Sequence, residues 1–324
     1  MTASATITPS RRLLRQAFAR GVAVLLYVVI LAVIFSVLAP SFMSGGTLSA
    51  VLDLTSPLLV VGVSMTMCLI AAEVDLSVAG VVGLSSTLTA FLLLKGQPWP
   101  IAVAAAVAAG GVVGVINGVL TARLVGLIPL FPSFLPTLAM QWVCIGVAGA
   151  LEPSQQSITI SDPAFAALFG GLLPLAYAIV VVILIQIVLS RSALGYRIFA
   201  VGANRSAARL VGIDVARTKA SVLALSGVLT GFAGVIMAGY FQGGYANVAQ
   251  GIELDAIAAA VIGGTALFGG RGSALGTLLG VLVLAVLDTG LLLVQVTPAL
   301  QLAARGIIVI FAVAADSYVR RLAG

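Results

Sequence analysis

The stretch SRSALGYRIFAVGANRSAARLVGIDVARTK, residues 190–219, is the most highly charged segment of an otherwise apolar chain. Six of the chain's 16 basic residues lie in it, against the single acid Asp214: Arg191, Arg197, Arg205, Arg209, Arg217 and Lys219. Charge-free apolar runs flank it on both sides, at 163–190 and 220–252. A basic segment between two such runs predicts a loop that connects membrane-spanning helices.

A short helix is predicted inside this loop. Asn204 is a good N-cap residue, and Gly212 is suited to the position just after a helix. The sequence RSAARLV between them forms about two turns, too few to be stable in water without packing against other structure. A short capped helix in a basic loop between spans indicates a docking element. Ala207 and Ala208 allow close approach, and Arg205 and Arg209 share one face and can pair with partner acids.

The composition predicts an all-α integral membrane protein. Hydrophobic residues make up 61% of the 324 residues and charged residues 8%, whereas soluble domains carry about 25% charged residues. Because roughly 20 apolar residues cross a bilayer as a helix, we expect about ten spans, some of them broken. They are predicted from the runs 21–39, 54–72, 76–94, 96–122, 124–151, 163–190 and 220–252 and from segments near 256–270, 274–294 and 300–316.

The arrangement of charge predicts the orientation of the chain. With the N-terminus inside, ten spans place fourteen of the sixteen basic residues on one side, and only Lys95 and Arg305 on or near the other. This is the bias of cytoplasmic loops, and it accounts for the net charge of +6 without nucleic-acid binding. We therefore expect a cytoplasmic N-terminal segment (1–20), one transmembrane domain (21–318) with a cytoplasmic loop at 191–219, and a cytoplasmic tail (319–324).

Glycines at helical spacing predict close helix packing, as at Gly110, Gly114 and Gly118, since small residues let helices approach in lipid. The paired glycines Gly263-Gly264 and Gly269-Gly270 are expected to interrupt a helix. Such breaks persist at membrane depth where they are buried in protein or line a wet cavity.

Polar residues within the apolar runs are candidates for a solute pathway. Asp75 is expected to cap the helix that begins at Leu76 or Ser77. The span that follows carries enough hydroxyl groups, including Ser85 and Ser86, to face a pathway or the interior of the bundle. The other candidates are Asn117, Gln141, Glu253, Asp255, Asp288 and Thr289.

Asp288 is the charged residue in the middle of the apolar segment 274–294. A carboxylate at the centre of a span costs about 2.5–3.5 kcal/mol, so exposure to lipid is disfavoured. Three environments remain open: contact with a wet pathway, an ion pair in the bundle, or a neutral acid bonded to another helix. Arg271 and Arg305 lie near the ends of their spans, although Arg305 can reach inward.

Several functions are disfavoured by what the sequence lacks. It contains no histidine, the commonest general base and metal ligand. Cys68 and Cys144 lie in apolar runs and suggest no disulfide, metal site or nucleophile. There is no Gly-Lys-Ser/Thr of a nucleotide-binding P-loop. The chain is therefore not expected to be an enzyme, or to bind a metal or ATP itself.

With these features in view, the chain resembles the permease subunits of ribose-type ATP-binding-cassette sugar importers. The resemblance rests on AVGANRSAARLVGI (200–213), ELDAIAAAVIGGTALFGGRGSALGTLLG (253–280) and AVAAD (312–316). VDLSVAG (74–80), INGVLTARL (116–124) and PSFLPTLAM (132–140) are similar to family segments in the same order. The chain departs from the family where GIDLSVG is usual at 73–80 and where Asn-Gly is common near 288–290, so the resemblance does not define the solute.

The resemblance implies a type II importer permease fold in a bacterial cytoplasmic (inner) membrane. Two permease chains, identical or paralogous, would form the pore, and an extracytoplasmic sugar-binding protein would deliver the solute. ATPase subunits, which hold the ATP and magnesium, would dock on the 191–219 loop. The docking residues carried over are Gly202, Asn204, Arg205, Ala207, Ala208, Arg209 and Gly212.

Two alternatives are retained at this stage. An importer of the same class could carry a branched-chain amino acid or an autoinducer, because in such systems specificity rests mainly with the binding protein. A secondary transporter or channel would instead need an intramembrane acid for ion coupling, for which Asp288 is the best candidate.

Overall fold

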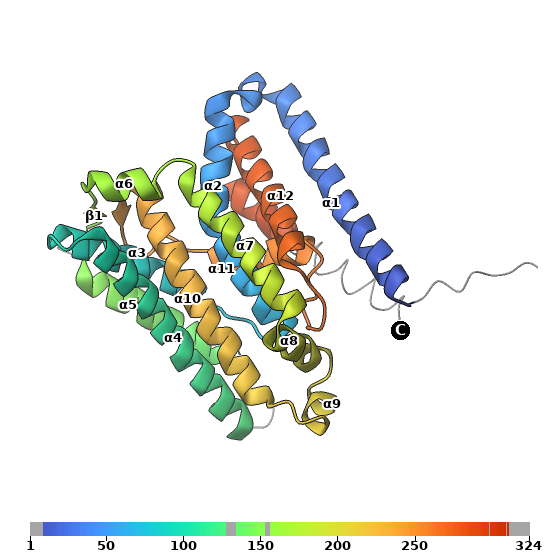
Figure 1. Ribbon diagram of the computed structural model, residues 1–324. Coiled ribbons are helices and arrows are strands. Elements are labelled where there is room, and N and C mark those ends of the chain that lie inside the picture. Colours follow the sequence, from blue (N-terminus) through green and yellow to red (C-terminus); the bar gives the residue numbers. More distant parts are fainter. Residues whose placement is uncertain (1–8, 128–133, 153–155, 298, 309, 311–324) are drawn as a thin grey trace, which may run out of the picture.

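The computed structural model describes residues 9–127, 134–152, 156–297, 299–308 and 310. In these ranges the chain is almost entirely helical (Figure 1). The helices are α1 (Pro9–Leu38), η1 (Pro40–Met43), α2 (Gly45–Ile70), α3 (Val78–Leu94), α4 (Trp99–Leu127), α5 (Leu135–Leu151), α6 (Pro163–Phe169), α7 (Leu173–Arg191), α8 (Ala193–Ala203), α9 (Arg205–Leu210), α10 (Val215–Phe241), α11 (Ile252–Ile262) and α12 (Ala274–Leu293), with a further helix at Ala299–Ile308. The two strands are β1 (Ile158–Thr159) and β2 (Gly243–Gly244).

The apolar runs form these helices, as predicted. Among the described residues, six helices are long and apolar enough to cross a bilayer: the Gly21–Leu38 part of α1, α2, the Trp99–Arg123 part of α4, α7, α10 and α12. Four shorter apolar helices accompany them, at Val78–Leu94, Leu135–Leu151, Ala193–Ala203 and Ala299–Ile308. The chain is therefore a multi-pass, all-α membrane protein.

The core of the bundle is built around α2 and α10. Leu59, Met67 and Ile70 of α2 and Val222 and Ile236 of α10 are fully or almost fully buried. By contrast, α1 lies at the edge of the molecule, where it packs on α12 (Figure 1). Its outer side chains are exposed, as expected for a helix that faces lipid.

The glycine spacing in α4 and α10 has the predicted packing role. A side chain at Gly110 would collide with the backbone of Gly227 and Gly231, and one at Gly114 with the backbone of Leu223. The two helices therefore touch backbone to backbone, which small residues alone permit.

The predicted break at Gly263-Gly264 is confirmed, and it divides the span predicted near 256–270. Helix α11 ends at Ile262, and Gly264, Gly269 and Gly270 take positive φ values of 91°, 95° and 79°. The chain re-enters a helix at Ala274, after Ser273 caps α12 by accepting the backbone N–H of Gly276 at 3.0 Å. At about 16 Å long, α11 is too short to cross a bilayer.

The run 220–252 also contains a break that the sequence analysis missed. Helix α10 ends at Phe241, where Gln242 adopts a left-handed φ of 49°. The chain then pairs β2 with β1 and runs back along α3. The carbonyl oxygen of Ala246 lies against Gly83, where any side chain would collide with it. Segment 242–251 is therefore non-helical and re-enters the bundle before α11 begins.

Parts of the predicted segments lie outside the described residues. These are residues 1–8, residues 128–133 of the predicted run 124–151 (which include the first two residues of the motif at 132–140), the whole motif at 312–316, the end of the predicted span at 300–316, and the tail 319–324.

Candidate functional site

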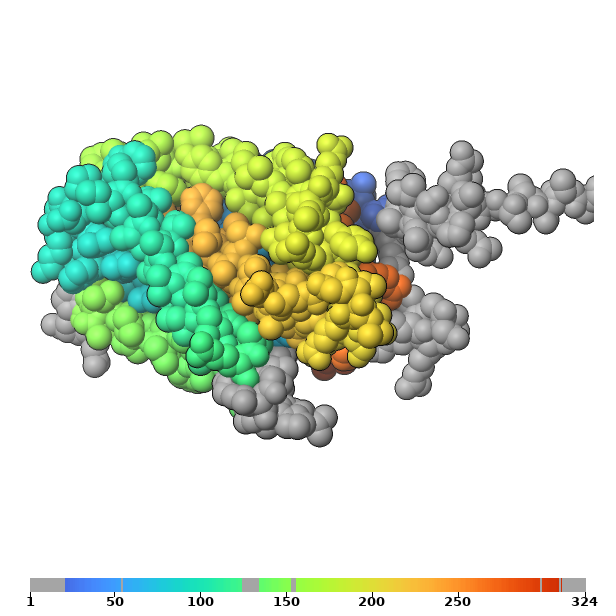
Figure 2. Space-filling view, turned by 60° about the horizontal axis from the view of Figure 1, so that its bottom comes forward, coloured from blue at the N-terminus to red at the C-terminus, as the bar shows by residue number. Residues whose placement is uncertain are grey.

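The predicted short helix in the basic loop is present as α9. Asn204 caps it, because its Oδ1 accepts the backbone N–H of Ala207 at 3.0 Å. Gly212 follows with a φ of +82°, a conformation that favours glycine. Asp214 then caps α10 through the backbone N–H of Arg217 at 2.9 Å. In Figure 1, α9 projects at one end of the molecule, beside the start of α10, and Figure 2 views that end.

The outward face of α9 differs from the one predicted. Ala208 is only 3% exposed and packs on Val201 and Val215, so it positions the helix and does not present a surface. Leu210 and Val211 are instead 89% and 72% exposed. Two exposed apolar residues beside the exposed Arg209 form a surface that a partner could cover.

Arg205, predicted to face a partner, also makes contacts within its own chain, and its pairing with partner acids stays a prediction. Its Nη2 donates to the carbonyl oxygen of Ala72 at 2.8 Å and lies 3.5 Å from Oε1 of Glu73. The same carboxylate is ion-paired with Lys219, at the start of α10. Glu73 and Lys219 are almost completely buried, while the Arg205 side chain is 44% exposed. The cluster of Arg205, Glu73 and Lys219 thus joins α9 to the end of α2 and to α10.

Backbone contacts reinforce this junction. The carbonyl oxygen of Ile70, the last residue of α2, accepts the backbone N–H of Gly270 at 2.9 Å. Gly202 lies directly against that carbonyl, and any side chain there would collide with it. Gly202, predicted to be a coupling residue, therefore lets the end of α8 touch α2 and the 269–270 turn.

Asp75 lies deeper, at the start of α3. Its Oδ1 accepts the backbone N–H of Ser77 at 3.0 Å and the Ser77 hydroxyl at 2.6 Å, while α3 itself begins at Val78. Its Oδ2 accepts the hydroxyl of Ser226, on α10, at 2.8 Å. The helix therefore begins one or two residues later than predicted, with Ser77 in the N-cap position, and Asp75, two residues before it, supports the start of α3 by bonding to Ser77.

This network extends to two more helices. Ser64, on α2, donates to the hydroxyl of Ser226 at 2.8 Å. Asn117, on α4, donates from Nδ2 to the hydroxyl of Ser77 at 2.8 Å. Asn117 is ten residues before the end of α4 at Leu127, about 15 Å along the helix axis. The network of Asp75, Ser77, Asn117, Ser226 and Ser64 therefore lies well inside the bundle.

The hydroxyl groups of α3 face the interior of the bundle, one of the two predicted alternatives. Ser85 donates to the carbonyl oxygen of Ala106 at 3.1 Å, and Ser86 to that of Gly243 at 3.5 Å. Both residues are fully buried. They join α3 to α4 and to the re-entrant segment. A role of either in a solute pathway stays a prediction.

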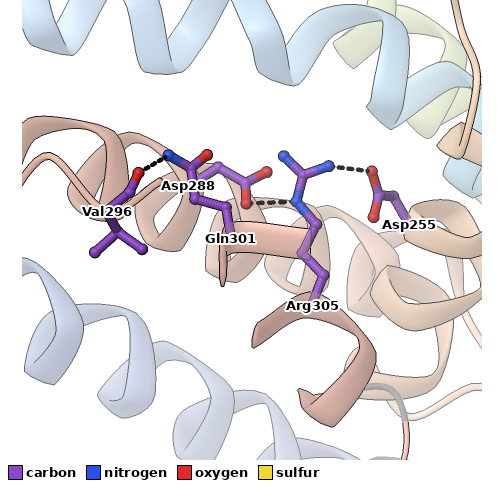
Figure 3. A network of polar contacts seen from close by, with 5 residues as sticks. All are labelled: Asp255, Asp288, Val296, Gln301 and Arg305. Carbon is purple, nitrogen blue, oxygen red and sulfur yellow. Dashed lines mark hydrogen bonds and ion pairs between the residues drawn. The ribbon is translucent and has the colours of Figure 1, made fainter. Parts of the chain in front are cut away.

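Asp288 is in an ion pair, one of its three predicted environments. Arg305 donates from Nε to Oδ1 of Asp288 at 2.8 Å and from Nη1 to Oδ2 of Asp255 at 3.1 Å (Figure 3). The arginine therefore reaches inward and links the helix at Ala299–Ile308 to α12 and α11. The neighbouring Thr289 is 5% exposed. Contact of Asp288, Asp255 or Thr289 with a solute stays a prediction.

Two of the predicted pathway residues, Gln141 and Glu253, meet at a pocket of about 270 Å³. It lies between α3, α5 and the segment that leads into α11. Nε2 of Gln141 is 3.5 Å from Oε1 of Glu253. Trp142, Asn247 and Gln250 complete its polar and aromatic lining, and no motif in the sequence marks these three residues.

No cluster of three metal-binding side chains is found in the part of the chain that the structure describes. Cys68 and Cys144 are both buried and unpaired by any disulfide.

Comparison with known proteins gives consistent matches over most of the chain. Residues 47–313 match the family model described as the branched-chain amino acid transport system / permease component. The L-arabinose ABC transporter permease protein of Azospirillum brasilense is 34% identical, over 94% of this chain and 89% of its own length. The fructose import permease protein of Rhizobium meliloti is 33% identical, over 89% and 82%. The ribose import permease protein of Escherichia coli is 32% identical, over 90% and 92%. No solved structure matches the chain significantly.

Proposed function

This chain belongs to the family of the branched-chain amino acid transport system permease component, and we propose that it is the membrane subunit of an ATP-driven importer of a monosaccharide. The observation that carries the sugar assignment is the series of relatives named for ribose, L-arabinose and fructose, each matched over most of both chains. The family description names amino acids, but a branched-chain amino acid carries two opposite charges at neutral pH. Relatives named for sugars favour a solute that is neutral and hydroxylated.

The ATPase subunit docks on α9. Support comes from the exposed Leu210 and Val211, from the exposed Arg209, and from the firm attachment of the helix through Asn204, Ala208 and Arg205. A rigidly held helix with an apolar tip suits a groove on a partner protein. ATP and magnesium are held by the ATPase. A second permease chain and an extracytoplasmic sugar-binding protein complete the assembly.

The test of this function is uptake by the reconstituted assembly. Proteoliposomes that contain the permease, its ATPase and the sugar-binding protein should accumulate radiolabelled D-ribose, L-arabinose or D-fructose when ATP is supplied to the ATPase side. Omission of either partner or of ATP should abolish uptake. Accumulation driven by a proton or sodium gradient, by this chain alone, would establish the secondary-transporter alternative instead.

The orientation has both termini and α9 in the cytoplasm of a bacterium, with the permease in the inner membrane. The arginine distribution supports it. Single cysteines at the exposed positions Ser44 and Gln97 should react with an impermeant maleimide applied to whole cells, whereas one at Ser206 should react only after the cells are opened. The buried Cys68 and Cys144 should give little background. Labelling of position 206 from outside would reverse the orientation.

A further inference from the structure

The pocket of Gln141 and Glu253 lies within the membrane-spanning part of the bundle. Its floor includes Ala79, two residues after Ser77, which hydrogen-bonds to Asn117 about 15 Å from the cytoplasmic end of α4. The hydrocarbon core of a bilayer is about 30 Å thick. The re-entrant segment 242–251 and the start of α11 form its other wall, so non-helical backbone lines a cavity at membrane depth.

The pocket contains a carboxylate, that of Glu253, whose hydrogen bonds are incompletely satisfied, which is unusual in a packed protein interior. Oε2 of Glu253 is buried and has no hydrogen-bond partner, although a buried carboxylate oxygen without a partner is costly. The other carboxylate oxygen has only the long 3.5 Å contact with Gln141. A ligand hydroxyl can donate to the Glu253 carboxylate, whose long contact with Gln141 is weak and replaceable. The position of Glu253 in the first turn of α11 also stabilises its negative charge.

The remaining lining supplies complementary groups. The amides of Gln141, Asn247 and Gln250 can each donate and accept hydrogen bonds. The Trp142 side chain is 69% exposed, which leaves the flat face of its indole available for an apolar ring face. No lysine or arginine is among the residues that line the pocket, so it offers no cation to pair with the carboxylate of an amino acid. A volume of about 270 Å³, near the lower end for ligand pockets, suits a small solute.

We propose that this pocket is a sugar-contact site of the translocation pathway, in which Glu253 and the three amides bind ring hydroxyls and Trp142 covers the apolar face of the ring. The proposal rests on the proposed import function and assigns residues to it. It places the solute directly beside the network of Asp75 and Ser77, at the start of α3.

Two variants of the reconstituted assembly test the site. Glu253→Gln keeps the size of the side chain but removes its charge, and Trp142→Ala removes the indole. Each should lower the rate of ATP-driven uptake about tenfold, the loss expected for one hydrogen bond to a charged group or one aromatic contact. Hydrolysis of ATP stimulated by the loaded binding protein should persist, because α9 is untouched. Val143→Ala, an exposed neighbour outside the pocket, should transport like the parent.

A third measurement separates binding from a purely structural role. Trp142→Phe should change the ratio of the uptake rates of D-ribose, L-arabinose and D-fructose, since a smaller ring covers a pentose and a hexose differently. A parent assembly that transports none of these sugars would contradict the proposed function itself. A parent that transports, together with Glu253→Gln and Trp142→Ala variants that retain its rates and its sugar preference, would refute the pocket alone.

Discussion

Replacing Leu210 with aspartate is expected to abolish ATP-driven uptake while the permease remains inserted and folded. The Leu210 side chain is 89% exposed at the end of α9, so the folded permease loses no internal contact. In the assembly, the new carboxylate would be buried against the ATPase. Removal of an apolar anchor together with burial of an unpaired charge should weaken assembly by roughly 100-fold or more. Co-purification of the ATPase with tagged permease measures this directly.

A matched control is available at the opposite end of the molecule. Leu94 is the last residue of α3 and is 55% exposed, and Figure 1 shows α3 on the side of the molecule away from α9. Leu94→Asp should leave co-purification of the ATPase unchanged, and Leu210→Ala should give a smaller loss than Leu210→Asp. Normal recovery of the ATPase with Leu210→Asp would exclude docking at the tip of α9.

The second large effect is expected at the buried ion pair of Glu73 and Lys219. Lys219→Met removes the cation that lies closest to a carboxylate only 1% exposed, and leaves Arg205 at 3.5 Å as its charged neighbour. Loss of one partner of a buried pair costs about 3–5 kcal/mol when the remaining charge is left uncompensated. Because Arg205 still faces Glu73, we expect a loss at the lower end of that range. We expect a fall of that size in the free energy of unfolding, measured by titration of detergent-solubilised permease with SDS.

The double variant Glu73→Gln/Lys219→Met provides the control. It removes both charges, so it should recover much of the stability that Lys219→Met loses. The recovered protein should nevertheless transport poorly, because Arg205 would keep only its bond to the Ala72 carbonyl oxygen. If Lys219→Met unfolds at the same SDS concentration as the parent, the pair contributes nothing to stability.

Much of the fold follows from local sequence signals. Long apolar runs predict the helices because, in lipid, a helix is the structure in which one segment satisfies all of its own backbone hydrogen bonds. Asn204 and Gly212 bound α9 for reasons contained within a few residues, and the structure confirms both. The Gly263-Gly264 break is predictable in the same way.

Contacts between distant segments were not predictable to the same degree. Lys219 and Glu73 are 146 residues apart in sequence, and either could have been taken for an ordinary loop charge. The outward face of α9 depends on how the helix packs, which the spacing of Ala208 and Leu210 alone does not define. The end of α10 at Phe241 could not be predicted from the absence of charge, because the re-entrant part of the run 220–252 is also free of charge. The pair Gly243-Gly244 was the available signal.

The short segment from Glu73 to Asp75 leaves almost no freedom of movement between its two ends. Glu73 is paired with Lys219, and Asp75 accepts a hydrogen bond from Ser226. Lys219 and Ser226 both lie on α10, seven residues and about 10 Å apart along its axis. Two residues of fully extended chain span only about 7 Å, so the side chains must bridge the rest. One end is bonded to α9 through Arg205, and the other supports the first turn of α3 beside the pocket of Gln141 and Glu253. A displacement of α9 along the membrane normal must therefore either break the contacts of Glu73 or also displace the first turn of α3.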